Sequence, residues 1–181
     1  MKKVLILFII MFSFFSKGNA EYRLLATDFS FTSVEGIPIN LSDYKQKVIV
    51  VVNVASRCGF TNQYKGLQTL WSEYKNKGLV VIGVPSNNFR QEPGNNKEIK
   101  KFCETTFGID FPITEKQSVI GTNAHPFFLW AKNNHGSGAI PKWNFHKIII
   151  GKNGKVVETF ASITKPTSKK FISAIEKEIK N

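Results

Sequence analysis

Two runs of apolar residues predict the central strands of a β-sheet. Residues 48–54 are valine or isoleucine at every position except Asn53, and a second apolar run covers residues 79–84. Continuous β-branched runs without polar alternation are typical of strands that are buried on both faces. We therefore expect a parallel or mixed sheet around these two segments.

Apolar positions at helical spacing predict four helices along the chain. The last of them follows Pro166, with Thr167 or Ser168 as its N-cap and Phe171 and Ile175 on its apolar face. The other three cover residues 62–76, 96–107 and 124–133.

Two turn signals predict hairpins at either end of this pattern. Glu35-Gly36 lies within residues 28–43, and Gly151-Lys152-Asn153-Gly154 separates residues 147–150 from 155–160. The element order is then a hairpin, βαβα, a helix, a second hairpin and a final helix. This order predicts a thioredoxin-like α/β fold, with a central mixed β-sheet flanked by helices and an N-terminal β-hairpin.

The first 20 residues have the layout of a signal peptide. A basic start precedes the apolar run of residues 4–15, and small residues end the segment at Ala20. The run is shorter than the roughly 20 apolar residues that cross a bilayer, and no cysteine follows it to carry a lipid. We expect cleavage after Ala20, one domain over residues 21–181 and no membrane insertion afterwards. The expected location is the bacterial periplasm, or a secretory lumen or the extracellular space in a eukaryote.

Composition narrows the classes of function. The chain of 181 residues is 42% hydrophobic and carries a net charge of +12. Loss of residues 1–20 leaves 22 basic against 13 acidic residues, a charge of +9. In the full chain lysine outnumbers arginine 22 to 3, and no aromatic–basic motif accompanies the positive charge, so we expect no nucleic-acid partner. A binding module for an anionic surface stays open as an alternative.

Cysteine and histidine usage excludes several kinds of site. Two cysteines, Cys58 and Cys103, rule out a disulfide-dense scaffold and a four-cysteine metal centre, but they allow one disulfide or one reactive thiol. The histidines His125, His135 and His146 have no ligand spacing with either cysteine. We expect neither a metal nor a cofactor.

Cys58 has the position of a reactive thiol. It follows the strand of residues 48–54 and precedes a helix, at the end of a sheet where α/β folds place ligands. The positive end of a helix and the adjacent Arg57 both favour a thiolate. Cys103 lies on the apolar stripe of its own helix, where a core role is the commoner one. The sequence spacing leaves a disulfide between the two undecided, because it needs Cα atoms within about 7 Å.

Three spaced motifs resemble the signature blocks of glutathione peroxidases, in the form that uses cysteine in place of selenocysteine. They run in the family's order and are the segments 53–61 around Cys58, 87–94 with Gln91-Glu92-Pro93-Gly94, and Trp143-Asn144-Phe145. The resemblance covers the chain from about residue 24 to the C-terminus and implies a thioredoxin fold and the reduction of hydrogen peroxide or organic, including lipid, hydroperoxides.

The resemblance also implies roles for individual residues. Cys58 would be the peroxidatic nucleophile and Gln91, Trp143 and Asn144 would surround its sulfur. Cys103 matches the resolving cysteine of thioredoxin-dependent members, which implies a Cys58–Cys103 disulfide and reduction by a thioredoxin-like protein in preference to glutathione. The short segment of residues 132–142 resembles monomeric members. The rival enzyme, an exported thiol–disulfide oxidoreductase of the same fold, normally uses a C-x-x-C pair, whereas Thr61 stands at that spacing.

Overall fold

The structure is a computed structural model that describes residues 23–181; the expected signal peptide lies outside the described residues. The regular elements are β1 (Ser30–Thr32), β2 (Pro38–Asn40), β3 (Val48–Val54), α1 (Gln63–Tyr74), β4 (Leu79–Pro85), α2 (Asn96–Phe107), α3 (Pro126–His135), β5 (Lys147–Ile150), β6 (Val156–Phe160) and α4 (Lys169–Lys180). Short 3-10 turns lie at Ala26–Asp28, Leu41–Tyr44, Lys75–Lys77 and Gly136–Ala139.

The central sheet is mixed, as the apolar runs predicted. Its strand order is β4-β3-β5-β6, with β3 parallel to β4 and antiparallel to β5. The small hairpin of β1 and β2 forms a separate antiparallel pair. In this arrangement the loops that follow β3 and β4 and the segment that precedes β5 all emerge at one edge of the sheet.

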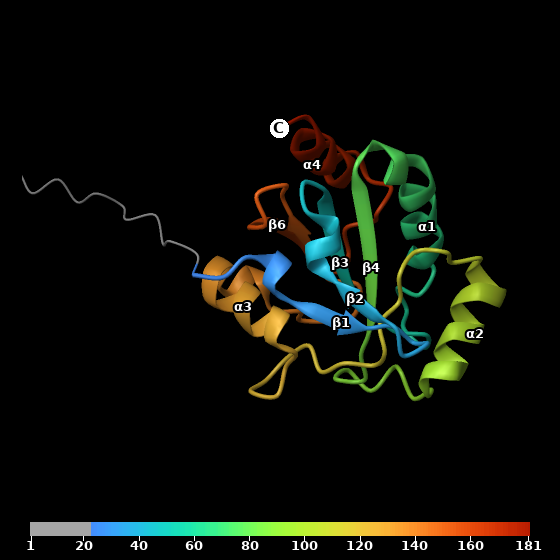
Figure 1. Cartoon of the computed structure of the whole chain (residues 1–181). Coiled ribbons are helices and arrows are strands. Elements are labelled where there is room, and N and C mark those ends of the chain that lie inside the picture. The colour runs from blue at the N-terminus through green and yellow to red at the C-terminus, as the bar shows by residue number, and fades with distance from the viewer. Residues whose placement is uncertain (1–22) are drawn as a thin grey trace, which may run out of the picture.

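Helices cover both faces of the sheet (Figure 1). Alternate residues of β3 point to opposite sides, so Val50 and Val52 pack in the core beneath α1, α2 and α4. Ile49 and Val51 pack on the other side, with α3 and the β1–β2 hairpin. Both faces of the sheet are therefore buried, which explains the absence of polar alternation in its sequence.

The predicted elements all form, but two helices differ from the prediction at both ends. α1 begins one residue later than predicted, and α3 ends at His135, two residues beyond its predicted end. The helix expected over residues 62–76 ends as an α-helix at Tyr74 and continues as a 3-10 turn to Lys77. The helix expected from residue 124 begins at Pro126, because His125 acts as its N-cap and its Nδ1 accepts a hydrogen bond from the N–H of Phe127 at 3.3 Å. None of the helices within residues 23–181 has the length and apolar character that a membrane crossing requires.

Lys147 is a buried cation that the hydrophobic pattern did not predict. It opens β5 with no exposed surface, and its Nζ donates to Gln63 Oε1 at 2.5 Å and to the Thr164 carbonyl at 2.6 Å. These acceptors are neutral, so burial lowers the pKa of the Lys147 ammonium to about 7. The side chain connects the sheet to α1 and to the loop that follows β6.

The Lys147 site predicts a pH dependence of stability. Above pH 7 the folded protein releases a proton that the unfolded chain keeps up to about pH 10.5, so the free energy of unfolding rises with pH in this interval. Urea unfolding between about pH 7 and 8 measures the slope, below the pKa of about 8.5 that cysteine has in an unfolded chain. Lys147→Met should flatten that slope whatever its effect on absolute stability. An equal slope in the variant would contradict the assignment.

Candidate active site

Cys58 lies in the turn that leads from β3 to α1. Its side chain is only 8% exposed, and Sγ accepts a hydrogen bond from the N–H of Phe60 at 3.4 Å. Thr61 holds the turn: its Oγ1 accepts from the N–H of Cys58 and donates to the Ala55 carbonyl, both at 3.0 Å. The turn therefore aims a backbone N–H at the sulfur, the atom that acts as the nucleophile in a reactive cysteine.

Gln91 and Asn144 meet beside this turn. Asn144 Nδ2 donates to Gln91 Oε1 at 2.9 Å, and the Gln91 carbonyl accepts from the N–H of Arg57 at 3.0 Å. The loop after β4, the segment before β5 and the loop of Cys58 therefore converge, as the strand order requires. Asn144 is fully buried and its Oδ1 has no hydrogen-bond partner in the structure. A buried, unpaired acceptor can receive the O–H of a bound peroxide.

Trp143 reaches the same end of the sheet and remains 40% exposed. Its ring packs on that of Phe89 with 5.3 Å between the ring centroids. Its carbonyl accepts a hydrogen bond from Asn53 Nδ2 at 3.2 Å. The structure thus places Trp143 next to Asn144 at the protein surface, packed on Phe89 and bonded to Asn53.

Asn53 is a positioning residue that the sequence analysis quoted without assigning a role. Its Oδ1 accepts from the N–H of His146 at 3.0 Å, and its backbone carbonyl accepts from the N–H of Phe145 at 2.6 Å. Together with the bond to the Trp143 carbonyl, these contacts fix the whole segment that carries Asn144. A polar residue in the middle of an apolar strand was the signal that could have revealed it.

Glu92 is a second positioning residue, and it is completely buried. Its carboxylate accepts hydrogen bonds from both the N–H and the Oγ of Ser56, at 2.8 and 2.6 Å. Its own N–H donates to Asn87 Oδ1 at 3.0 Å. Burial raises the pKa of Glu92, while the Ser56 bonds and the nearby Lys116 and Arg57 act in the opposite direction. Glu92 joins the Gln91 loop to the Cys58 loop.

Cys103 lies on the buried face of α2 and is 1% exposed. It belongs to the same hydrophobic core cluster as Cys58, and both thiols are free. Burial raises the pKa of the Cys103 thiol to about 11, with the nearby Tyr64 hydroxyl acting in the opposite direction. At neutral pH Cys103 is therefore a protonated, inert thiol while α2 is intact.

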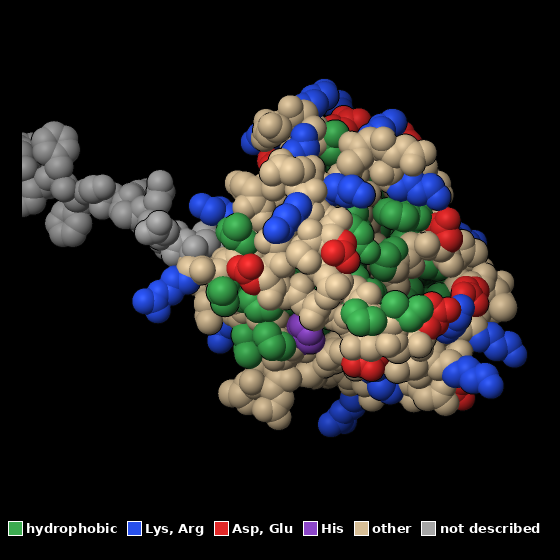
Figure 2. Space-filling model, viewed as in Figure 1, with side chains coloured by type: hydrophobic (Ala, Val, Ile, Leu, Met, Phe, Trp, Pro, Cys, Tyr) green, Lys and Arg blue, Asp and Glu red, His purple; other side chains and the backbone are tan. Residues whose placement is uncertain are grey.

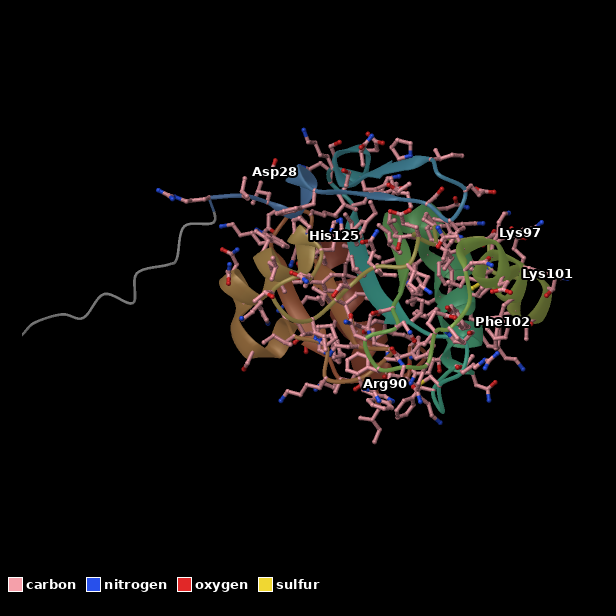
Figure 3. All side chains as sticks on the ribbon, turned by 90° about the horizontal axis from the view of Figure 1, so that it is seen from below. Asp28, Arg90, Lys97, Lys101, Phe102 and His125 are labelled. Carbon is pink, nitrogen blue, oxygen red and sulfur yellow. The ribbon has the colours of Figure 1, made fainter. Side chains whose placement is uncertain are left out.

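A polar cleft of about 490 Å³ separates the Cys58 loop from α2. Ser56, Arg57 and Glu92 line one side, and Ile99 and Phe102 line the other. In Figure 3, α2 carries Lys97 and Lys101 as well as Phe102, and Arg90 lies on the loop that follows β4. The cleft therefore lies along the first two turns of α2, which carry Ile99 and Phe102.

Comparison with known proteins identifies the family. The glutathione peroxidase family model matches residues 26–132, which is more than half of the chain. A Synechocystis protein named hydroperoxy fatty acid reductase gpx1 is 46% identical, over 76% of this chain and 87% of its own length. The chain belongs to the glutathione peroxidase family. The expected family is therefore confirmed, and with it the activity of a thiol peroxidase.

Other members and their structures agree with this assignment. The glutathione peroxidase-like peroxiredoxin GPX5 of Chlamydomonas reinhardtii is 43% identical, over 83% of this chain and 93% of its own length. The crystal structure of T. cruzi GPX1 matches with a TM-score of 0.67 and 30% identity, covering 87% of this chain and 98% of that one. The predicted thioredoxin-like fold is confirmed.

The rival functions find less support in this glutathione peroxidase. A thiol:disulfide interchange protein from Chlorobium tepidum matches with a TM-score of 0.64 at 18% identity, which shows the shared fold alone. Thr61 stands where a C-x-x-C motif would have its second cysteine, and its hydroxyl accepts the hydrogen bond from the N–H of Cys58. Lysine and arginine side chains are scattered over the face in Figure 2, with acids among them, and form no single basic patch there. Within residues 23–181 no group of three or more His, Cys, Asp or Glu side chains could hold a metal ion.

The contact between Asn144 and Gln91 generates a prediction for catalysis. Asn144→Ala removes one amide of the site and the partner that orients the other, so the second-order rate constant for Cys58 oxidation should fall roughly 100-fold. Stopped-flow fluorescence during a single peroxide turnover measures this rate constant. Gln68→Ala, which removes an amide bonded to Asp110, is the matched control and should leave the rate constant unchanged. Equal rate constants in Asn144→Ala and the wild type would exclude Asn144 from the catalytic machinery.

Proposed function

We propose that this peroxidase reduces hydroperoxides through Cys58, with Gln91, Asn144 and Trp143 around the reacting atoms. The observation that carries the proposal is the nearly buried Cys58 sulfur with an N–H donor at 3.4 Å, next to the paired amides of Gln91 and Asn144. The thiolate attacks one peroxide oxygen, and the O–O bond breaks. Its electron pair leaves on the second oxygen, which takes up a proton to give an alcohol or water, while Cys58 becomes a sulfenic acid.

The second step of the proposed cycle joins Cys58 to Cys103. The Cys103 sulfur attacks the sulfenic sulfur, an S–S bond forms and the S–O bond breaks. The departing hydroxyl leaves as water with the proton that Cys103 loses. Because Cys103 faces the core from within α2, this step requires a local opening of the helix. The adjoining cleft of about 490 Å³ supports such an opening.

A dithiol protein of the thioredoxin class completes the proposed cycle by exchange with the disulfide, in preference to glutathione. The peroxiredoxin name of the Chlamydomonas relative supports this choice. The name of the Synechocystis relative supports fatty acid hydroperoxides as substrates, alongside hydrogen peroxide. We also propose that the chain acts in a bacterial periplasm after removal of residues 1–20, because their layout in the sequence is that of a signal peptide. We propose that it acts there as a monomer, because the short segment of residues 132–142 resembles that of monomeric members.

A stoichiometric pulse of peroxide tests the disulfide step. Peptide mass spectrometry should find Cys58 cross-linked to Cys103 in the wild type. Cys103→Ser should accumulate sulfinic acid at Cys58, because no second thiol removes the sulfenic acid. Cys58→Ser is the control and should show neither product nor peroxide consumption. A wild-type protein with over-oxidised Cys58 and free Cys103 would contradict the resolving role of Cys103.

The reductant is tested by steady-state turnover with one hydroperoxide and two donors. A thioredoxin system should support a kcat/KM at least roughly 100-fold above that of glutathione. The reason is that the second thiol of a dithiol protein attacks the mixed disulfide within the same complex, whereas glutathione needs a second molecule for this step. Consumption of NADPH through the matching reductase measures both reactions. Equal turnover with glutathione would reject the proposed donor.

A further inference from the structure

A second cavity lies next to the residues that directly follow Cys58. It has a volume of about 400 Å³ and lies between α1 and the loop that follows β6. Gly59 and Phe60, the two residues after Cys58, form one wall, and Ile163 and Pro166 form part of the other. The N–H of Phe60 is the group that donates to Cys58 Sγ. The cavity wall is thus in direct contact with the nucleophile, and its volume falls in the range of small-molecule sites.

The loop that forms the outer wall is held by the protein interior. Gln63 Nε2 donates to the Ser162 carbonyl at 2.6 Å, and the buried Lys147 Nζ donates to the Thr164 carbonyl at 2.6 Å. The loop also packs against α1 at Gly66, where an added Cβ would be in ordinary van der Waals contact with Pro166, 3.4 Å from its Cβ. These contacts fix both carbonyls that flank Ile163, so the cavity exists without a ligand.

Ile163 lies at the tip of this loop and is 77% exposed, more than any other large hydrophobic residue in the described chain. The hydrogen bonds to the Ser162 and Thr164 carbonyls hold this side chain in water. There it contributes no free energy of apolar burial to the stability of the fold. A fixed, exposed apolar side chain at the mouth of a cavity next to a nucleophile is typical of a binding surface.

The charge around the cavity selects the kind of ligand. Lys165 is the one charged residue that lines it, and no Asp or Glu takes part in the lining. Phe60, Ile163 and Pro166 supply an apolar surface. A cavity with apolar walls, a single cation and no carboxylate suits an amphiphile with one negative charge.

We propose that this cavity binds the acyl chain of a fatty acid hydroperoxide, with Lys165 pairing with the ligand's carboxylate. The inference rests on the proposed function, since it places the hydroperoxide group at Cys58. The acyl chain packs against Phe60 and Ile163, and the hydroperoxide group extends along Gly59 and Phe60 to the Cys58 sulfur. Hydrogen peroxide has no acyl chain and reaches Cys58 without using the cavity.

Two variants and two substrates test this site. Ile163→Ser should lower kcat/KM for linoleic acid hydroperoxide about tenfold, because the acyl chain loses apolar contact, and should leave hydrogen peroxide within about twofold. Lys165→Glu should lower kcat/KM about tenfold for the free acid and leave its methyl ester unchanged, because the ester has no charge to pair. Ile37→Ser is the matched control, since Ile37 is also exposed, at 58%, and does not line this cavity.

Several outcomes overturn the proposal. The first is an unchanged kcat/KM for linoleic acid hydroperoxide in both variants, and the second is an equal loss of kcat/KM with hydrogen peroxide. The third is an unchanged kcat/KM for the lipid together with a raised KM for the protein reductant, a result that would assign the surface to the reductant. Binding of hydroxylinoleic acid to Cys58→Ser protein, measured by calorimetry, gives a readout without turnover. Weaker binding on adding Ile163→Ser supports the site even if the wild type reduces no peroxide, a result that would reject only the proposed function.

Discussion

The candidate active site depends on the way Asn53 holds the segment before β5. Phe145 has a φ of +64°, a left-handed conformation that costs a non-glycine residue about 1–2 kcal/mol. The bonds of Asn53 to Trp143, Phe145 and His146 hold this conformation. As a result, Asn144 contacts Gln91 while the next side chain, Phe145, packs in the core at 5.4 Å from the ring of Tyr64.

The sequence predicted the elements and the convergence of the site, but not the groups that hold it together. β3 and α2 have the predicted bounds. β3 is an apolar run interrupted only by Asn53, and α2 has the Asn95–Glu98 capping box at its start and Gly108 at its end. Cys58, Gln91 and Asn144 follow or precede neighbouring strands, so strand order alone places them together. Glu92 and Lys147 were missed, because a buried polar residue has no period and its partners lie 36 and 84 positions away in the chain.

Lys147 also shows why the core and the surface near Cys58 cannot be treated as independent. Its ammonium replaces hydration with three neutral oxygens, including the carbonyls of Ser162 and Thr164. Breaking this arrangement leaves a buried charge without partners, which costs more than the bonds themselves contribute. The loop between those carbonyls therefore stays in place with Ile163 in water. Hydrogen bonds of a buried side chain thus hold an apolar residue at the surface.

The two cysteines of the proposed cycle differ in what keeps them ready. Cys58 is held by a short turn with an N–H donor at its sulfur, so it can react while the fold is intact. Cys103 is unreactive for the opposite reason, because burial in α2 keeps its pKa at about 11 and its sulfur in the core. Opening of α2 would remove the desolvation that raises this pKa and release the side chain in the same event. In the proposed cycle, the ionisation and the accessibility of the Cys103 thiol thus depend on one local unfolding equilibrium. The stability of α2 then sets the lifetime of the sulfenic acid at Cys58.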